Sequence, residues 1–192
     1  RIDYTDSTEG ALLLEPTRSN LITYSEDFTH SYWTKSNISI ISNSIISPDG
    51  TLNADKLTEN NVNNQHYARR LFTVSGEFSM SIFVKKAEKD KLWLGNVSTS
   101  QYSIFDLTNE SSINYGTTSS KIENYGNGWY RCSIVDTLNQ QAFLSFGLLD
   151  DNNNINYQGD GVSGLYAWGF QYESNSSYAT SYIPTNGSTV QR

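Results

Sequence analysis

Few residues in this sequence have the types that covalent catalysis requires. Nucleophilic catalysis pairs a serine or cysteine with a histidine base, and the chain has only two histidines, His30 and His66. His30 lies in a polar stretch that is typical of a solvated loop. His66 directly follows Gln65, and in a strand two adjacent side chains point to opposite faces rather than into one cleft. The sequence therefore predicts a protein that is not an enzyme, and a lyase or hydrolase is the least favoured interpretation.

Other site chemistries are also poorly represented in the sequence. Glycoside hydrolysis needs two carboxyl groups opposed across a groove, whereas Asp150, Asp151 and Asp160 crowd into polar loops typical of solvated turns. Neither zinc-ligand spacing nor a phosphate-binding glycine loop occurs, and no cofactor is predicted. The single cysteine, Cys132, cannot form an internal disulfide. It alternates with apolar neighbours, which predicts a buried structural thiol.

The composition favours β structure and weighs against two classes of partner. Tyr 13, Phe 8 and Trp 4 accompany many serines, threonines and asparagines, a mixture typical of half-buried strands joined by polar turns. The net charge of -7 lacks the basic footprint of a nucleic-acid-binding protein. No apolar run approaches the roughly 20 residues that a membrane span needs. Neither nucleic acid nor a membrane is therefore predicted as a partner.

The charged fraction and the first residue bear on where the protein works. Charged residues make up 17% of the chain, below the typical quarter, so the surface is polar mainly through amides and hydroxyls. This is common in proteins outside the cytosol and predicts a secreted or cell-surface location, with a virion as the alternative. The chain opens on Arg1 without a signal peptide, which predicts a piece of a longer protein.

Alternating hydrophobicity predicts an antiparallel β-sandwich. The clearest case is the stretch 78–84, in which Phe78, Met80, Ile82 and Val84 alternate with mostly polar residues, the pattern of a strand with one buried face. Further strands are predicted at 21–23, 38–41, 67–74, 91–97, 102–107, 129–135, 142–149 and 164–172. Short polar connections join them, as in sandwich folds. The length fits one domain, 1–192, in which 1–19 form an extended arm that includes the apolar residues 11–14.

The same alternation predicts which side chains face away from the core. The inward positions are taken to be even-numbered in the strands at 67–74, 78–84, 91–97 and 129–135. The outward positions are then both aromatic and basic: Tyr67, Arg69, Phe83, Lys85, Lys91, Trp93, Trp129 and Arg131. Aromatic rings and guanidinium groups suit a polysaccharide that carries sulfate or uronate groups. Trp93 is the strongest candidate, because Leu92 and Leu94 fix its register. The alternative is that these aromatics cover sandwich edges or pack under the N-terminal arm.

Several segments together resemble the jelly-roll carbohydrate-binding modules of families 4 and 22. The resemblance rests on the stretch from Asn20 to Phe28 followed by Trp33, on Gly128-Trp129-Tyr130-Arg131, and on 166–173 as the last strand. A closer resemblance, over nearly the whole chain, is to domains of phage fibre or spike proteins and of bacterial surface or polysaccharide-degrading proteins. Its segments are 14–21, 47–50, 54–57 and 180–185. Trp33 and Trp168 lie in these structural motifs and are expected in the core.

The resemblance implies an all-β jelly roll and a function in binding rather than catalysis. The first hypothesis is a non-catalytic carbohydrate-binding module that targets a catalytic domain of the same parent chain to a polysaccharide or oligosaccharide, such as an anionic algal glycan. The second is a structural or assembly domain of a phage fibre or bacterial surface protein. Related modules often hold a structural calcium, for which Glu26 and Asp27 are candidate ligands, but Trp168 stands where a further aspartate is expected.

Overall fold

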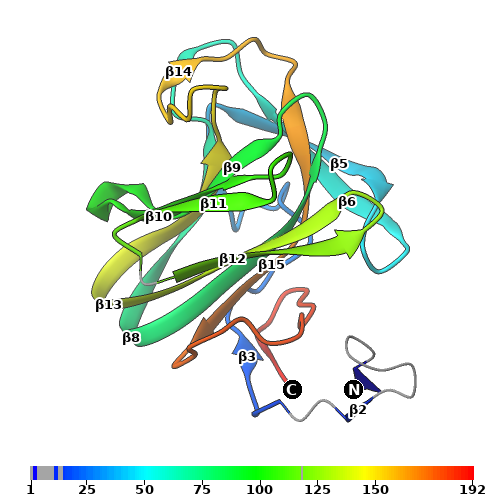
Figure 1. Ribbon diagram of the computed structural model, residues 1–192, viewed down its shortest axis with the longest axis vertical. Coiled ribbons are helices and arrows are strands. Elements are labelled where there is room, and N and C mark those ends of the chain that lie inside the picture. Colours follow the sequence, from blue (N-terminus) through cyan, green and yellow to red (C-terminus); the bar gives the residue numbers. More distant parts are fainter. Residues whose placement is uncertain (1, 4–10, 13–14, 118) are drawn as a thin grey trace.

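The computed structural model describes residues 2–3, 11–12, 15–117 and 119–192. These form an antiparallel, all-β sandwich of jelly-roll type, which confirms the predicted fold class (Figure 1). The described residues include no α-helix, and their only helical turn is η1 (Val97–Thr99). No helix in this part of the chain is long and apolar enough to cross a membrane. Most of the predicted arm, together with Leu13 and Leu14, lies outside the described residues.

Two long strands, β8 (Tyr67–Lys86) and β13 (Trp129–Leu148), run antiparallel over their whole length and contribute to both layers of the sandwich. The first layer contains residues 78–86 of β8 and 129–136 of β13. Its other strands are β5 (Ile38–Ile46), β6 (Leu52–Glu59), β15 (Gly164–Ser174) and β12 (Ser119–Gly126). The second layer contains 67–74 of β8 and 140–148 of β13. It is completed by β4 (Thr34–Ser36), β9 (Lys91–Asn96), β10 (Gln101–Asp106) and β11 (Ser111–Tyr115).

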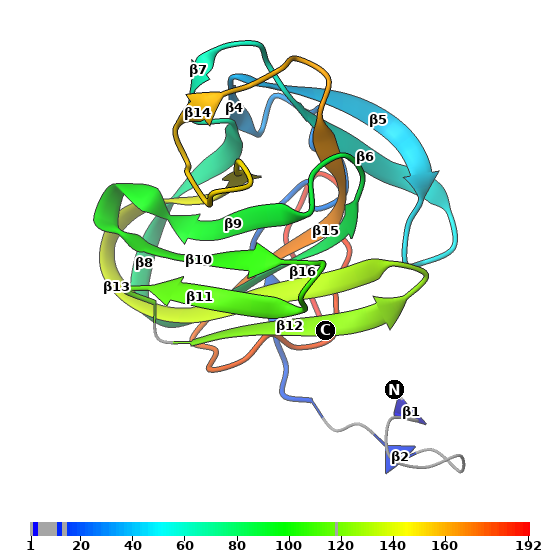
Figure 2. The same cartoon turned by 45° about the horizontal axis from the view of Figure 1, so that its top comes forward.

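The prediction of separate strands at 67–74 and 78–84, and at 129–135 and 142–149, is wrong. Polar residues around Gly76 and between 136 and 141 resemble turns in the sequence, but the chain stays extended there and the pairing of β8 with β13 continues without a shift. Figure 2 shows both strands curving from one layer into the other, and it shows β11 next to β12. The hydroxyl groups of Ser112 and Ser120 lie 2.8 Å apart where these two strands adjoin. One side of the sandwich is therefore closed.

The core lies between the layers and follows the predicted alternation. Met80 and Ile82, at even-numbered positions of β8, are fully buried there, together with Leu92 and Leu94 of β9. Trp33 joins this core, as predicted. Cys132 is also buried in it, and burial raises the pKa of its thiol, as expected for a structural cysteine.

Three short strand pairs complete the fold. They are β1 (Ile2–Asp3) with β2 (Ala11–Leu12), β3 (Ser19–Asn20) with β16 (Val190–Gln191), and β7 (Asn63–Asn64) with β14 (Tyr157–Gln158). The sequence predicted a strand at 21–23, whereas the strand in the structure, β3, lies just before that stretch. The predicted turn at 47–50 is present: the Gly50 N–H donates to the Ser47 carbonyl at 3.0 Å, and Gly50 has a φ of 88°.

Candidate functional site

The outward face of the first layer gathers four of the eight predicted site residues. Phe83 and Lys85 are odd-numbered residues of β8, and Arg131 and Trp129 are their direct partners on β13. Because directly paired residues project from the same face, the four side chains lie together. The strand register thus brings together four of the eight residues that were expected to share one outward face.

The prediction that this face is open to solvent is wrong for three of these residues. Phe83, Trp129 and Arg131 are buried, and only Lys85 is partly exposed. Phe83 and Trp129 pack with Trp168 in a second apolar cluster, partly covered by Tyr182. The burial of Trp168 agrees with the sequence prediction. The sheet face is thus a second, smaller core beneath a segment that alternation along the strands does not reveal.

That covering segment is the stretch 175–186 near the C-terminus, which buried polar side chains of β15 hold in place. The Glu173 carboxylate accepts hydrogen bonds from the N–H and the hydroxyl of Thr180 at 2.9 and 2.5 Å. The Gln171 side-chain oxygen accepts one from the Ile183 N–H at 2.7 Å. These bonds compensate for the burial of a charge and an amide on a sheet face.

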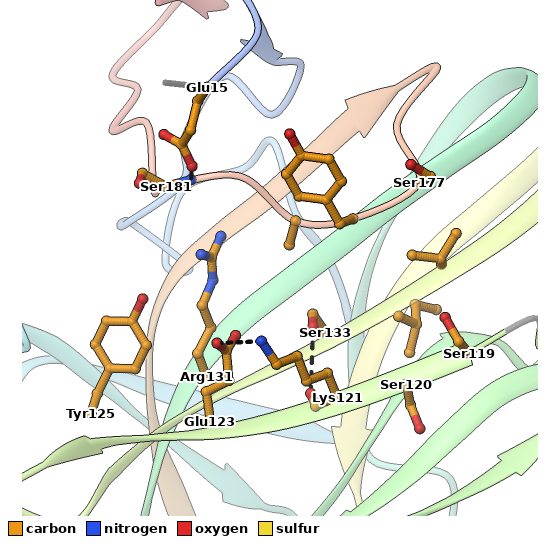
Figure 3. Close-up of a pocket in the computed structure, with 14 residues that line it drawn as sticks. Glu15, Ser119, Ser120, Lys121, Glu123, Tyr125, Arg131, Ser133, Ser177 and Ser181 are labelled. Carbon is orange, nitrogen blue, oxygen red and sulfur yellow. Dashed lines mark hydrogen bonds and ion pairs between the residues drawn. The ribbon is translucent and has the colours of Figure 1, made fainter. Parts of the chain in front are cut away.

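A cavity of about 400 Å³ remains where the covering segment separates from β12. Its walls are the β12 residues on one side and the segment around Tyr178 on the other, and β13 forms its floor. Figure 3 shows the Arg131 side chain extending from β13 into this space, with Tyr125 on one side and Ser133 on the other. Glu15 and Ser181 lie across the cavity from β12. Ser119, Ser120 and Ser177 add further hydroxyl groups to the lining.

Arg131 is the most unusual residue of the cavity, because it is only 3% exposed yet its guanidinium forms no ion pair with any described residue. Its Nε and Nη2 atoms donate to Ser81 Oγ at 3.2 and 2.9 Å. The guanidinium carbon lies 5.3 Å from the centre of the Phe83 ring. Glu123 pairs with Arg131 across the strands, but its carboxylate binds Lys121 Nζ at 2.7 Å.

Two exposed tyrosines border the cavity. Tyr125 and Tyr178 are 43% and 46% exposed, and both line it. The Tyr125 and Phe83 rings form an edge-to-face contact with centres 4.9 Å apart, and this contact fixes the orientation of the Tyr125 ring. Tyr125 also lines a second hollow, of about 330 Å³, together with Lys85 and Trp129. The two hollows therefore adjoin at Tyr125.

The other four predicted residues lie elsewhere, on the outward face of the second layer. Trp93, the strongest candidate from the sequence, is 1% exposed and packs with Ile104 and Leu149, so the expected exposure is wrong. Tyr67 and Arg69 are partly exposed, and the Arg69 guanidinium covers the Phe143 ring at 3.8 Å. Lys91 donates to the Asp151 carbonyl at 2.9 Å. The two hollows that adjoin at Tyr125 include none of these four residues in their linings.

Sequence reasoning missed both tyrosines and the whole of β12. A signal for β12 was present, because Lys121, Glu123 and Tyr125 alternate with residues of the other face. Tyr178 gave no signal, since it lies in an irregular segment whose position depends on contacts with β15.

A third hollow, of about 380 Å³, is acidic and includes the two candidate calcium ligands Glu26 and Asp27, together with Asp55. The Asp55 carboxylate already accepts backbone hydrogen bonds from Phe28 and Asn43 at 3.0 and 3.1 Å. Glu26 accepts bonds from Asn53 and Tyr182, both at 3.1 Å. Within the described ranges, no group of three or more acidic, histidine or cysteine side chains could hold a metal ion.

The histidines are engaged in structural contacts. His66 is fully buried, and its ring nitrogens face the backbone carbonyls of Asn37 and Tyr157 at 2.7 and 3.4 Å. The His30 ring stacks on Tyr24 with centres 3.6 Å apart and accepts from the Tyr32 N–H. His30 is therefore only partly exposed, not the freely solvated residue that was expected.

A scan against protein-family models and a search of curated proteins find no match to this chain.

Proposed function

We propose that this domain is a non-catalytic carbohydrate-binding module that attaches a secreted polysaccharide-degrading enzyme, as its catalytic partner in the same parent chain, to a polysaccharide. One observation carries the proposal: a hydroxyl-rich cavity bordered by the exposed rings of Tyr125 and Tyr178. Sugars present apolar C–H faces, which pack on aromatic rings, and hydroxyl groups, which exchange hydrogen bonds with polar walls.

The arrangement suits binding better than bond cleavage. Cleavage of a glycosidic bond uses two carboxyl groups across a groove. The two carboxylates of the cavity, Glu15 and Glu123, are both in ion pairs, with Arg192 at 2.6 Å and Lys121 at 2.7 Å. Both histidines lie outside the cavity lining. Its residues thus supply contacts for a sugar but no free acid and base pair.

A second candidate is the structural or assembly domain of a phage fibre or bacterial surface protein. It is favoured by an apolar pair on the β5–β6 hairpin, where Ile46 and Leu52 are directly paired across the strands and are 60% and 61% exposed. Adjacent exposed apolar side chains are suited to contact with another protein surface.

Affinity electrophoresis in gels containing neutral or acidic polysaccharides tests the first candidate. We expect retardation by at least one polysaccharide, and Tyr125→Ala and Tyr178→Ala should each weaken it by about fivefold, the loss of one ring contact of about 1 kcal/mol. Tyr115→Ala is the matched control, since Tyr115 is 39% exposed but lies on β11 and stacks on Tyr102.

The same samples are analysed by light scattering and for released reducing ends or unsaturated products. Absence of retardation by every polysaccharide would overturn the proposal, and a stable trimer that binds no sugar would support the assembly candidate. Release of products would support an enzyme instead.

A further inference from the structure

We infer that the ligand of the cavity carries a carboxylate or sulfate group and that Arg131 binds it; this rests on the proposed function. The starting observation is a buried guanidinium without a counter-charge. Charged side chains that are removed from water are almost always paired, because an isolated buried charge loses much of its hydration energy. Here Ser81, a neutral hydroxyl, is the only hydrogen-bond acceptor of the Arg131 side chain among the described residues.

The nearby carboxylates are already engaged in other contacts. Glu123 binds Lys121, and Glu15 binds Arg192 and the Ser181 N–H. Glu173, on the same face of β15, accepts bonds from Ser79 and Thr180. The positive charge of Arg131 therefore has no protein partner within the described ranges, and the cavity is the space into which it points (Figure 3).

The geometry of Arg131 suits an anion with two oxygens. Nε and one N–H of Nη2 are used by Ser81, which leaves the N–H groups of Nη1 and the second N–H of Nη2. These form the end of the guanidinium fork, which binds carboxylate or sulfate oxygens in pairs. The bonds to Ser81 and the Phe83 ring hold the fork in place before the ligand arrives. A sugar ring beside Tyr125 or Tyr178 could thus present its acidic group to Arg131.

The test uses two pairs of polysaccharides that differ mainly in charge: polygalacturonate and its methyl ester, and a sulfated carrageenan and agarose. Wild-type protein should bind the charged member of at least one pair about tenfold more tightly, which also identifies the group as carboxylate or sulfate, and added NaCl should weaken this binding. Arg131→Met should remove the preference, whereas Arg70→Met, the matched control, should keep it because Arg70 contacts Tyr32 outside the cavity.

Two further variants keep the test decisive if Arg131→Met fails to fold. Arg131→Lys retains the charge without the fork and should lose most of the affinity for the charged polysaccharide. Glu123→Gln removes the negative charge opposite Arg131 and should increase that affinity. Equal binding of charged and neutral polysaccharides, or unchanged preference in the Arg131 variants, would overturn the inference and leave the proposed function intact. If the protein binds none of these four polysaccharides and no other polysaccharide, the proposed function itself is overturned.

Discussion

Asp55 is a buried carboxyl group whose ionisation opposes folding. Burial raises its pKa from the ordinary 3.8 to about 6, although two backbone N–H groups donate to it. Because the folded-state pKa lies above the unfolded value, its contribution to stability is greatest at low pH and is lost as pH rises through about 6. Raising the pH from 5 to 7.5 should lower the free energy of unfolding by about 1 kcal/mol more in wild type than in Asp55→Asn. Urea unfolding at both pH values measures this difference, and parallel pH dependence would contradict it.

At the scale of single residues, the sequence predicted faces but not exposure. Alternation placed Phe83, Trp129 and Arg131 on one face, and the register of β8 and β13 agrees. Phe83 contacts Tyr182, about 100 residues further along the chain, and the Trp129 ring N–H donates to the Ile46 carbonyl of the β5–β6 hairpin. A period of two contains no information about such long-range covers. Trp93 was misjudged for the same reason, because the side chains of Ile104 and Leu149 cover it.

At the scale of elements, local patterns identified strands more reliably than their ends. The period-two stretches 78–84 and 91–97 are strands in the structure, and the core positions within them are correct. The continuity of β8 through Gly76 could not be predicted, because polar residues at an exposed bend resemble a turn. There the strand is maintained by its pairing with β13, a long-range contact. Tyr125 was missed for a related reason, since its strand β12 has little buried apolar surface of its own.

Close approach of two strands makes one glycine of β9 indispensable. Gly95 pairs with Tyr102 and has a φ of 137°. An added Cβ would lie 2.4 Å from the Gln101 carbonyl oxygen and 2.5 Å from Tyr102 Cα. Gly95→Ala should therefore lower the free energy of unfolding by more than about 2 kcal/mol, because the backbone of β10 must move.

Gly50→Ala is the control for Gly95→Ala. Gly50 also has a positive φ, 88°, but no atom lies within 4 Å of its added Cβ. Gly50→Ala should therefore lower the free energy of unfolding by only about 1 kcal/mol. Chemical denaturation of both variants gives the comparison, and equal losses would show that β9 and β10 have room for a side chain.

At the scale of the whole molecule, the stretch 15–20 meets the C-terminal strand β16 beside the cavity. β3 pairs with β16, and Arg18 and Arg192 exchange backbone hydrogen bonds of 3.1 and 2.9 Å. Glu15 strengthens this contact: its carboxylate binds Arg192 Nη2 at 2.6 Å and accepts from the Ser181 N–H at 2.7 Å. Glu15 and Ser181 both line the cavity, so the junction of the stretch 15–20 with the C-terminal strand also forms one of its walls.

Glu15→Ala should therefore weaken ligand binding as well as stability. Loss of the two bonds should lower the free energy of unfolding by about 1 kcal/mol and speed hydrogen exchange at the Ser181 amide, because the wall loses its anchor. Glu88→Ala is the matched control. Like Glu15, Glu88 binds one basic side chain, that of Lys56 at 2.7 Å, and accepts from one backbone N–H, that of Gly164, but it lies outside the cavity. Its removal should reduce stability comparably and leave the affinity for polysaccharide unchanged. If Glu15→Ala binds polysaccharide as tightly as Glu88→Ala does, the contact of Glu15 with the C-terminal residues holds the fold together without shaping the site.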